Sequence, residues 1–175
     1  MSLPSVESLI DTLTQALKPY FPTRQPQDQQ PIIVGIETGG YRVARAIHQA
    51  IKPETELGRL NISFYRDDFT KSGLHPTINP SSLPTNIDGK TIILIDDVLY
   101  SGRTIRAAMN EIFDYGRPQR IILAILIDRG EREIPIQADI VADRIELKAG
   151  EHIKLEGQNP LVLTIKSVTD HHASE

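Results

Sequence analysis

Three continuous apolar runs constrain the fold of this chain more than any other feature. They lie at residues 31–36, 91–95 and 120–127. Short runs of this kind are typical of strands buried on both faces of a parallel sheet. Segments with apolar residues at helical spacing alternate with them, at 5–20, where Ser5 can cap the first turn, at about 41–51, and from about Thr104 to Gly116. The alternation predicts an α/β fold, a doubly wound and mostly parallel sheet with helices on both faces.

Two parts of the chain depart from this alternation. Leu60, Ile62 and Phe64 alternate with polar residues and predict a strand that ends near Tyr65. Residues 66–89 carry three prolines and two glycines, so we expect a long flexible lid there. Past Ala138, short runs at 139–142, 144–148, 152–155 and 161–168 predict hairpin strands of a small β-rich hood over about 139–168. No repeat or linker divides the chain, and we expect one domain over 1–175.

The composition excludes several kinds of protein. The 175 residues include no Cys, which rules out disulfides, thiolate metal sites and Cys nucleophiles. The net charge of -4 argues against a chain whose main task is to coat nucleic acid, although a local basic face is compatible with an acidic average. No apolar run has membrane-spanning length and no secretory signal begins the chain, so we expect no membrane partner and a cytoplasmic location.

The segment 92–104, IILIDDVLYSGRT, carries the chemistry. Asp96 and Asp97 are expected where the 91–95 strand ends, the edge at which open parallel sheets bind ligands. Ser101-Gly102-Arg103-Thr104 is expected to begin the next helix, whose free N–H groups and dipole bind phosphate. Two carboxylates beside a phosphate site suit a ligand with hydroxyls between its charged ends, so the pattern indicates a sugar phosphate.

An apolar strand followed by Asp-Asp also occurs in receiver domains and in Walker B segments. The chain contains no Gly-x-x-x-x-Gly-Lys-Ser/Thr motif, so a Walker B strand would lack its partner. The Ser-Gly-Arg-Thr helix start follows the acidic pair closely, which favours one compact strand–loop–helix site.

With these residues the chain resembles the type I phosphoribosyltransferases, and closely the pyrimidine-operon regulator family (PyrR), whose members double as uracil phosphoribosyltransferases. The resemblance covers nearly the whole chain after residue 31. It includes segments 34–36, 62–68, 113–118 and 127–139 besides the 92–104 loop. It implies a pyrimidine-salvage transferase that converts uracil and phosphoribosyl diphosphate to UMP and diphosphate. It further implies regulation by transcription attenuation, through binding of a pyr messenger leader, and a dimer or larger homo-oligomer.

The same resemblance implies roles for individual residues. Asp96, Asp97 and Arg66 would be catalytic, the first two on the ribose hydroxyls and Arg66 reaching the diphosphate as the lid closes. The implied substrate-binding set is Thr38, Gly39 and Gly40 for the diphosphate, with Asp96, Asp97, Val98, Leu99, Tyr100, Ser101, Gly102, Arg103 and Thr104 for the ribose 5-phosphate. Mg²⁺ would be carried by the diphosphate and ribose oxygens and not by a cage of protein ligands. Arg129, at the end of the 120–127 run, is expected to contact the base or the diphosphate.

Two departures from the family pattern affect the interpretation. Purine salvage enzymes place an Asp three residues after the acidic pair, where this chain has Tyr100, which favours a pyrimidine base. The diphosphate loop of better-known members reads Lys-Thr-Arg-Gly, whereas this chain has Glu37-Thr38-Gly39-Gly40. Backbone N–H groups can still bind diphosphate there, with Arg66 or Arg42 as the compensating cation.

Basic residues are dispersed along the chain and aromatic residues for base stacking are few. Two alternatives to the enzyme therefore remain open. One is a UMP-sensing, RNA-binding attenuator with little catalytic role, and the other is an inactive assembly partner of pyrimidine enzymes.

Overall fold

The computed structural model describes residues 3–62, 80–84 and 86–167. Its elements are α1 (Val6–Leu17), η1 (Lys18–Tyr20), η2 (Gln27–Gln29), β1 (Ile32–Ile36), α2 (Gly39–Ile51), β2 (Gly58–Leu60), β3 (Thr91–Leu99), α3 (Arg103–Tyr115), β4 (Arg120–Asp128), β5 (Ile140–Arg144), β6 (Glu151–Glu156) and β7 (Val162–Ser167). Among these residues, no helix combines the length and the apolar composition that crossing a membrane requires.

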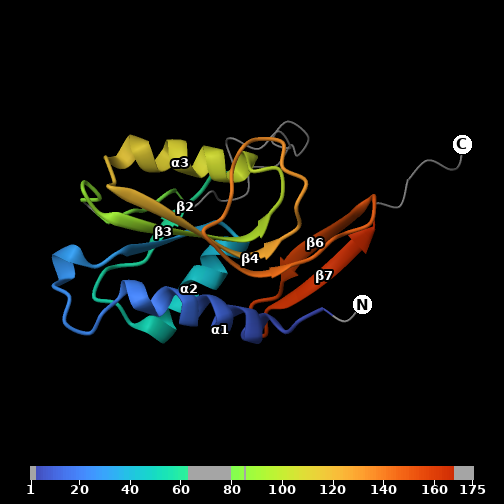
Figure 1. Ribbon diagram of the computed structural model, residues 1–175, viewed down its shortest axis with the longest axis horizontal. Helices are drawn as coiled ribbons and strands as arrows, with labels where there is room; N and C mark the ends of the chain where they lie inside the picture. Colours follow the sequence, from blue (N-terminus) through green and yellow to red (C-terminus); the bar gives the residue numbers. More distant parts are fainter. Residues whose placement is uncertain (1–2, 63–79, 85, 168–175) are drawn as a thin grey trace, which may run out of the picture.

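The centre of the molecule is a five-stranded sheet in the order β2-β1-β3-β4-β5, in which every neighbouring pair is parallel. Figure 1 shows α3 on one face of this sheet and α1 and α2 on the other. The predicted doubly wound α/β fold is confirmed. The three apolar runs form β1, β3 and β4, which are the inner strands of the sheet, covered on both faces.

Side chains alternate along each inner strand and so contribute to two hydrophobic cores, one on each face of the sheet. Ile93 and Ile95 of β3 pack with α1 and α2, whereas Ile92 and Leu94 pack with α3. This follows from the period of two in a strand, which sends successive side chains to opposite faces. Both cores are built almost entirely from aliphatic side chains, so the low aromatic content is no obstacle to their packing.

The first helix follows its sequence signals. Ser5 accepts a hydrogen bond from the backbone N–H of Ser8 at 3.2 Å, the capping interaction that a serine at this position supplies. Leu9, Leu13 and Leu17 are buried at helical spacing. The α-helix ends at Leu17, and the predicted last turn to residue 20 is the 3₁₀ helix η1.

Strands near the sheet edges differ from expectation. The strand expected around Leu60–Tyr65 is β2, which covers only Gly58–Leu60, while residues 63–65 lie outside the described part of the chain. The run 139–142, expected in the hood, is wrong as a hairpin strand: it belongs to β5, which pairs in parallel with β4 at the sheet edge. The run 144–148 forms no strand of its own. Within residues 3–62, 80–84 and 86–167, β6 and β7 form the antiparallel hairpin. An alternating pattern predicts a strand but does not specify which strand it pairs with.

The end of the predicted lid is packed onto the domain. Ser82 exchanges two backbone hydrogen bonds with Arg59, at 2.7 and 2.8 Å. Ile87 is 1% exposed and belongs to the core on the α3 side. Residues 80–84 and 86–89 therefore extend the sheet edge and the core. The rest of the predicted lid, 66–79 and 85, lies outside the described residues.

Candidate functional site

The acidic pair lies inside the central strand. β3 continues to Leu99 because its pairing with β4 continues to Asp128, so the expectation that the strand ends at Ile95 is wrong by four residues. Asp96 is 4% exposed, and Asp97 is half-buried. One carboxylate oxygen of Asp96 accepts the backbone N–H of Asp97 at 3.0 Å. Both carboxylates are therefore held on a rigid element.

The first turn of α2 packs directly against this pair. A Cβ atom at Gly39 would lie 2.1 Å from Oδ2 of Asp97. A Cβ atom at Gly40 would lie 2.6 Å from the carbonyl oxygen of Ile95 and 2.7 Å from Cα of Asp96. The tight turn expected at Thr38-Gly39-Gly40 lies instead at Glu37 and Thr38, and the two glycines are the first two residues of α2. Their missing side chains bring the N-terminus of α2, with its free N–H groups, onto the acidic pair.

The loop between β3 and α3 brings a second helix start to the same edge. Gly102 has φ of 91°, in the left-handed region that favours glycine. A Cβ atom there would lie 3.0 Å from Cγ1 of Ile134. Arg103 begins α3, and its backbone N–H is bonded to Oγ of Ser101 at 3.3 Å. The loop residues 98–104 predicted from the sequence therefore do connect the acidic pair to a helix N-terminus.

Segment 129–136 lies across this loop and is tied to its backbone. The N–H of Arg129 donates to the carbonyl oxygen of Leu99 at 3.0 Å. The N–H groups of Glu133 and Ile134 both donate to the carbonyl oxygen of Ser101, at 3.0 and 3.2 Å. An ion pair of 2.6 Å between Arg103 and Glu133 adds a side-chain link. The shape of the loop thus depends on a segment thirty residues further along.

Arg132 is the side chain that joins most of these parts. Its guanidinium donates to the carbonyl oxygens of Tyr100 at 2.8 Å, Gly130 at 3.1 Å and Ile136 at 2.9 Å. It also donates to Oδ1 of Asp128 at 2.7 Å. The sequence does not reveal this role of Arg132, because a charged residue in a loop carries no pattern that identifies its carbonyl partners.

The Asp128 carboxyl titrates abnormally because of these contacts. Burial raises the pKa of Asp128, but the hydrogen bonds from Arg132 and the Gly130 N–H, with the charges of Arg132 and Arg144, outweigh that effect. The net result holds the pKa of Asp128 below its ordinary value of 3.8. The carboxylate is therefore the stable anionic anchor of the Arg132 network.

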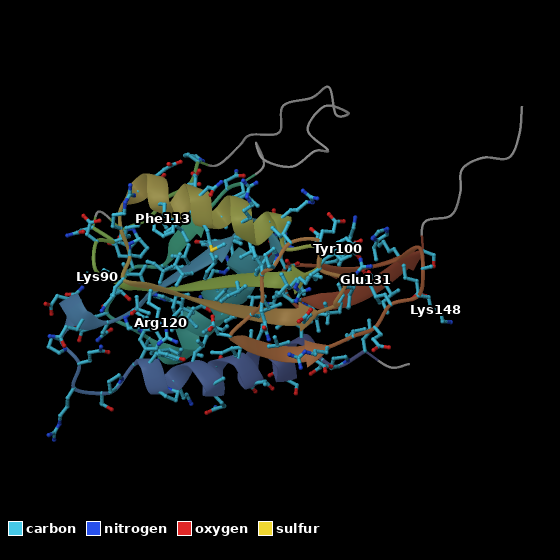
Figure 2. All side chains as sticks on the ribbon, turned by 45° about the horizontal axis from the view of Figure 1, so that its top comes forward. Lys90, Tyr100, Phe113, Arg120, Glu131 and Lys148 are labelled. Carbon is cyan, nitrogen blue, oxygen red and sulfur yellow. The ribbon has the colours of Figure 1, made fainter. Side chains whose placement is uncertain are left out.

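Arg129 and Tyr100 form a stacked pair. The guanidinium carbon of Arg129 lies 4.0 Å from the centroid of the Tyr100 ring, within the range of a cation–π contact. The Arg129 side chain is 10% exposed and bonds Glu131 at 2.8 Å, while its buried Nε has no hydrogen-bond partner among the described residues. Figure 2 shows Tyr100 and Glu131 at the same end of the sheet. Arg129 thus covers the ring of the residue three positions after the acidic pair.

Of the two arginines expected to assist the diphosphate loop, only Arg42 is among the described residues, and it is bonded to another part of the chain. Arg42 donates to the carbonyl oxygen of Gly157 at 2.8 Å, in the turn between β6 and β7. It also lines a hollow of about 610 Å³ between α1, α2 and that turn, which includes no residue of the acidic pair or loop. Arg66 lies outside the described residues. Among the described residues, Arg59 does reach the loop, and its Nε lies 3.5 Å from Oε1 of Glu37.

No group of three or more His, Cys, Asp or Glu side chains that could hold a metal ion occurs within the described ranges. The carboxylates of Asp96 and Asp97 are hard oxygen donors of the type that Mg²⁺ accepts.

Comparison with known proteins shows what the chain is similar to. Residues 10–160 match the family model of the phosphoribosyl transferase domain. The chain is 48% identical over 166 residues to the bifunctional protein PyrR of Pseudomonas paraeruginosa, covering 95% of this chain and 96% of that protein. It is 47% identical over 168 residues to the protein of the same name from Pseudomonas fluorescens, covering 96% and 99%.

Solved structures with the same fold are more distant in sequence. A hypoxanthine phosphoribosyltransferase from Staphylococcus aureus superposes with a TM-score of 0.63 at 17% identity, covering 85% of this chain and 79% of that one. A purine phosphoribosyltransferase from Pyrococcus horikoshii has a TM-score of 0.60 at 21% identity, covering 83% and 86%. At these identities the similarity shows a shared fold and nothing about function.

Proposed function

We propose, on the premise that the chain belongs to the phosphoribosyl transferase domain family and within it to the bifunctional PyrR proteins, that it makes UMP. In this reaction uracil attacks C1 of the ribose of phosphoribosyl diphosphate, a carbon–nitrogen bond forms, and the bond to diphosphate breaks. The uracil N1 proton is released.

The contact between Gly39 and Asp97 is the observation that carries this proposal. It brings the N-terminus of α2 onto one side of the acidic pair, while the loop 98–102 leads from the pair to the N-terminus of α3. Two helix starts that favour anions therefore flank two carboxylates that favour hydroxyls. Phosphoribosyl diphosphate has the matching order of groups, a phosphate, a ribose diol and a diphosphate.

Each part of the substrate then has its own partner. The 5-phosphate fits residues 100–104 at the start of α3, and the diphosphate fits the backbone N–H groups at Thr38, Gly39 and Gly40. Asp96 and Asp97 accept from the ribose hydroxyls, and each such charge-assisted hydrogen bond contributes roughly 1.5–3 kcal/mol. The rigidity of β3 fixes the ribose relative to the two anions, so catalysis comes mainly from positioning.

Stabilisation of the departing diphosphate is the second requirement. The transition state places positive charge on the ribose and negative charge on the leaving group, and N–H groups aimed at that charge lower the barrier. A Mg²⁺ ion carried by the substrate would supply further neutralisation of the diphosphate. Asp96 and Asp97 are the carboxylates of this chain suited to lie beside that ion and the ribose hydroxyls.

The choice of base rests on position 100. The phenol ring of Tyr100 occupies the place where a purine enzyme has a carboxylate, and the Arg129 guanidinium covers that ring at 4.0 Å. A neutral phenol with a cation over its ring offers no carboxylate to take the ring proton of a purine. This arrangement supports uracil as the acceptor.

A second activity is favoured by the name bifunctional that the relatives carry. We expect control of pyrimidine genes through a pyr messenger leader, with UMP as effector and the chain as a homo-oligomer. Several arginines in the described ranges are already paired, such as Arg59 with Glu37 and Arg132 with Asp128. Weak, salt-sensitive binding that UMP strengthens is therefore the form this activity takes, measurable as a mobility shift of the leader RNA at low salt.

The decisive experiment measures product formation from labelled uracil, phosphoribosyl diphosphate and Mg²⁺. UMP should form only when all three are present. Hypoxanthine and orotate serve as alternative acceptors in parallel reactions. Turnover of either of them without turnover of uracil contradicts the pyrimidine assignment, and turnover of none contradicts the enzyme.

A further inference from the structure

We propose that Arg59 cancels the charge of Glu37 and so keeps the N-terminus of α2 able to bind the diphosphate of the substrate. This inference rests on the proposed function and deepens it. Glu37 immediately precedes Thr38 and the first turn of α2. An uncompensated carboxylate at that place would repel an incoming diphosphate.

The backbone holds the two residues side by side. β1 and β2 are parallel with Gly35 opposite Arg59 and Ile36 opposite Leu60. The N–H of Glu37 extends this pairing by donating to the carbonyl oxygen of Leu60 at 2.8 Å. On its other side Arg59 is bonded through N–H and C=O to Ser82. The backbones of both residues are therefore held next to each other by the hydrogen bonds of the sheet.

The side chains are placed for charge compensation. Nε of Arg59 lies 3.5 Å from Oε1 of Glu37, and the two side chains are 28% and 17% exposed. The Arg59 guanidinium also lies 5.7 Å from the centroid of the Tyr41 ring, which belongs to the first turn of α2. Partial burial limits screening by water and salt, so the pair presents a near-neutral surface beside Thr38 and Gly39.

The contact is electrostatic in character. Nε of Arg59 is buried and has no hydrogen-bond partner among residues 3–62, 80–84 and 86–167, although the carboxylate of Glu37 is near. An arginine placed for structure alone would normally satisfy this donor. Nε of Arg59 therefore interacts with the Glu37 carboxylate through charge and not through a directed hydrogen bond.

No other arginine suggested by the sequence takes this role in the described structure. Arg42 is engaged with the hairpin turn, and Arg66 is outside the described residues. Arg59 thus offsets, through the fold, the negative charge that Glu37 brings to the turn.

Direct binding of Mg²⁺-phosphoribosyl diphosphate by calorimetry tests the inference without requiring turnover. The proteins are the unaltered chain, Glu37→Gln, Arg59→Gln, the double variant, and Arg59→Lys. Arg45→Gln is the matched control, because Arg45 is an exposed cation in α2, beyond the first turn at which the diphosphate is proposed to bind. Thermal unfolding of each protein reports whether it is folded.

Removing Arg59 alone should weaken binding about tenfold, because one full negative charge is then exposed near the diphosphate. Glu37→Gln should bind as well as the unaltered chain or more tightly. The double variant should return to within about threefold of it, since both charges are gone. Arg59→Lys, which keeps the charge, and Arg45→Gln should bind like the unaltered chain.

Two results overturn the inference while leaving the enzyme intact. Unchanged binding by Arg59→Gln shows that the charge of Glu37 does not matter. Equal loss in Arg59→Gln and the double variant shows that Arg59 touches the ligand itself. If Arg59→Gln does not fold, a tenfold loss in Arg59→Lys or in the double variant overturns the inference as well. If the unaltered chain binds no phosphoribosyl diphosphate, the proposed function fails first and this inference falls with it.

Discussion

The substitution Gly39→Ala should reduce turnover and leave the stability of the fold nearly unchanged. The new Cβ atom would lie 2.1 Å from Oδ2 and 2.4 Å from Cγ of Asp97, whereas ordinary contact begins at 3.4 Å. The carboxylate must therefore retreat by roughly 1 Å, and a misplacement of that size at a reacting centre costs on the order of 10²-fold in rate. This corresponds to about 2.7 kcal/mol in the barrier.

Stability should change little in Gly39→Ala. The atoms that must move belong to a half-buried side chain that can rotate. Gly40→Ala is the matched comparison. Its Cβ atom would meet backbone atoms of Ile95 and Asp96, which cannot rotate away, so we expect a loss of about 1–3 kcal/mol.

The assay combines kcat/KM for phosphoribosyl diphosphate with thermal unfolding of both variants. Gly39→Ala should keep its Tm and lose turnover, and Gly40→Ala should lose Tm. Turnover of Gly39→Ala within about threefold of the unaltered chain, well short of the loss expected from misplacing Asp97, refutes the reasoning. A Tm loss equal to that of Gly40→Ala also refutes it, because the clash would then be structural.

Four further predictions concern the acidic pair, the Arg132 network and the ion pair between Arg103 and Glu133. Asp97→Asn should reduce kcat/KM roughly 10- to 100-fold, as expected when one charge-assisted acceptor is lost, and undiminished turnover would contradict the ribose role. Arg132→Met should destabilise the fold by roughly 1.5–3 kcal/mol, because the largely buried Asp128 carboxylate then keeps only the Gly130 N–H and the more distant Arg144 as partners. Arg103→Met, which breaks an exposed pair, should cost less than about 1 kcal/mol in chemical denaturation. The lowered pKa of Asp128 adds stability that is fully present above its unfolded value and is lost as the pH falls below 3.8 through the folded value. The unfolding free energy of Asp128→Asn should therefore lie below that of the unaltered chain at pH 7, and the difference should shrink as the pH falls below 3.8. A difference that stays constant down to the acid unfolding transition would exclude this linkage.

Local signals predicted much of the architecture. The apolar runs became β1, β3 and β4, because only strands covered on both faces tolerate uninterrupted apolar side chains. Ser5 and Gly102 sit where their chemistry is needed, one as a helix cap and one at positive φ. These outcomes depend on neighbours within a few residues, which a sequence displays directly.

Which strands would pair with one another was less predictable from the sequence. Residues 140–144 were expected in the hood, yet they extend the main sheet next to β4. An alternating pattern reports a half-buried strand and says nothing about which edge will accept it. The extension of β3 through Asp97 has the same origin, since the length of β4 decided it.

The sequence by itself determined that an acidic pair in a buried strand is followed by a short glycine-containing loop and a helix start, because all three are encoded within thirteen residues. Only the tertiary structure decided what surrounds that loop. Gly39 meets Asp97, Arg132 bonds the carbonyl of Tyr100, and Arg59 reaches Glu37. Each of these contacts joins residues more than twenty positions apart, and their closeness follows from strand order and helix packing, which no local pattern records.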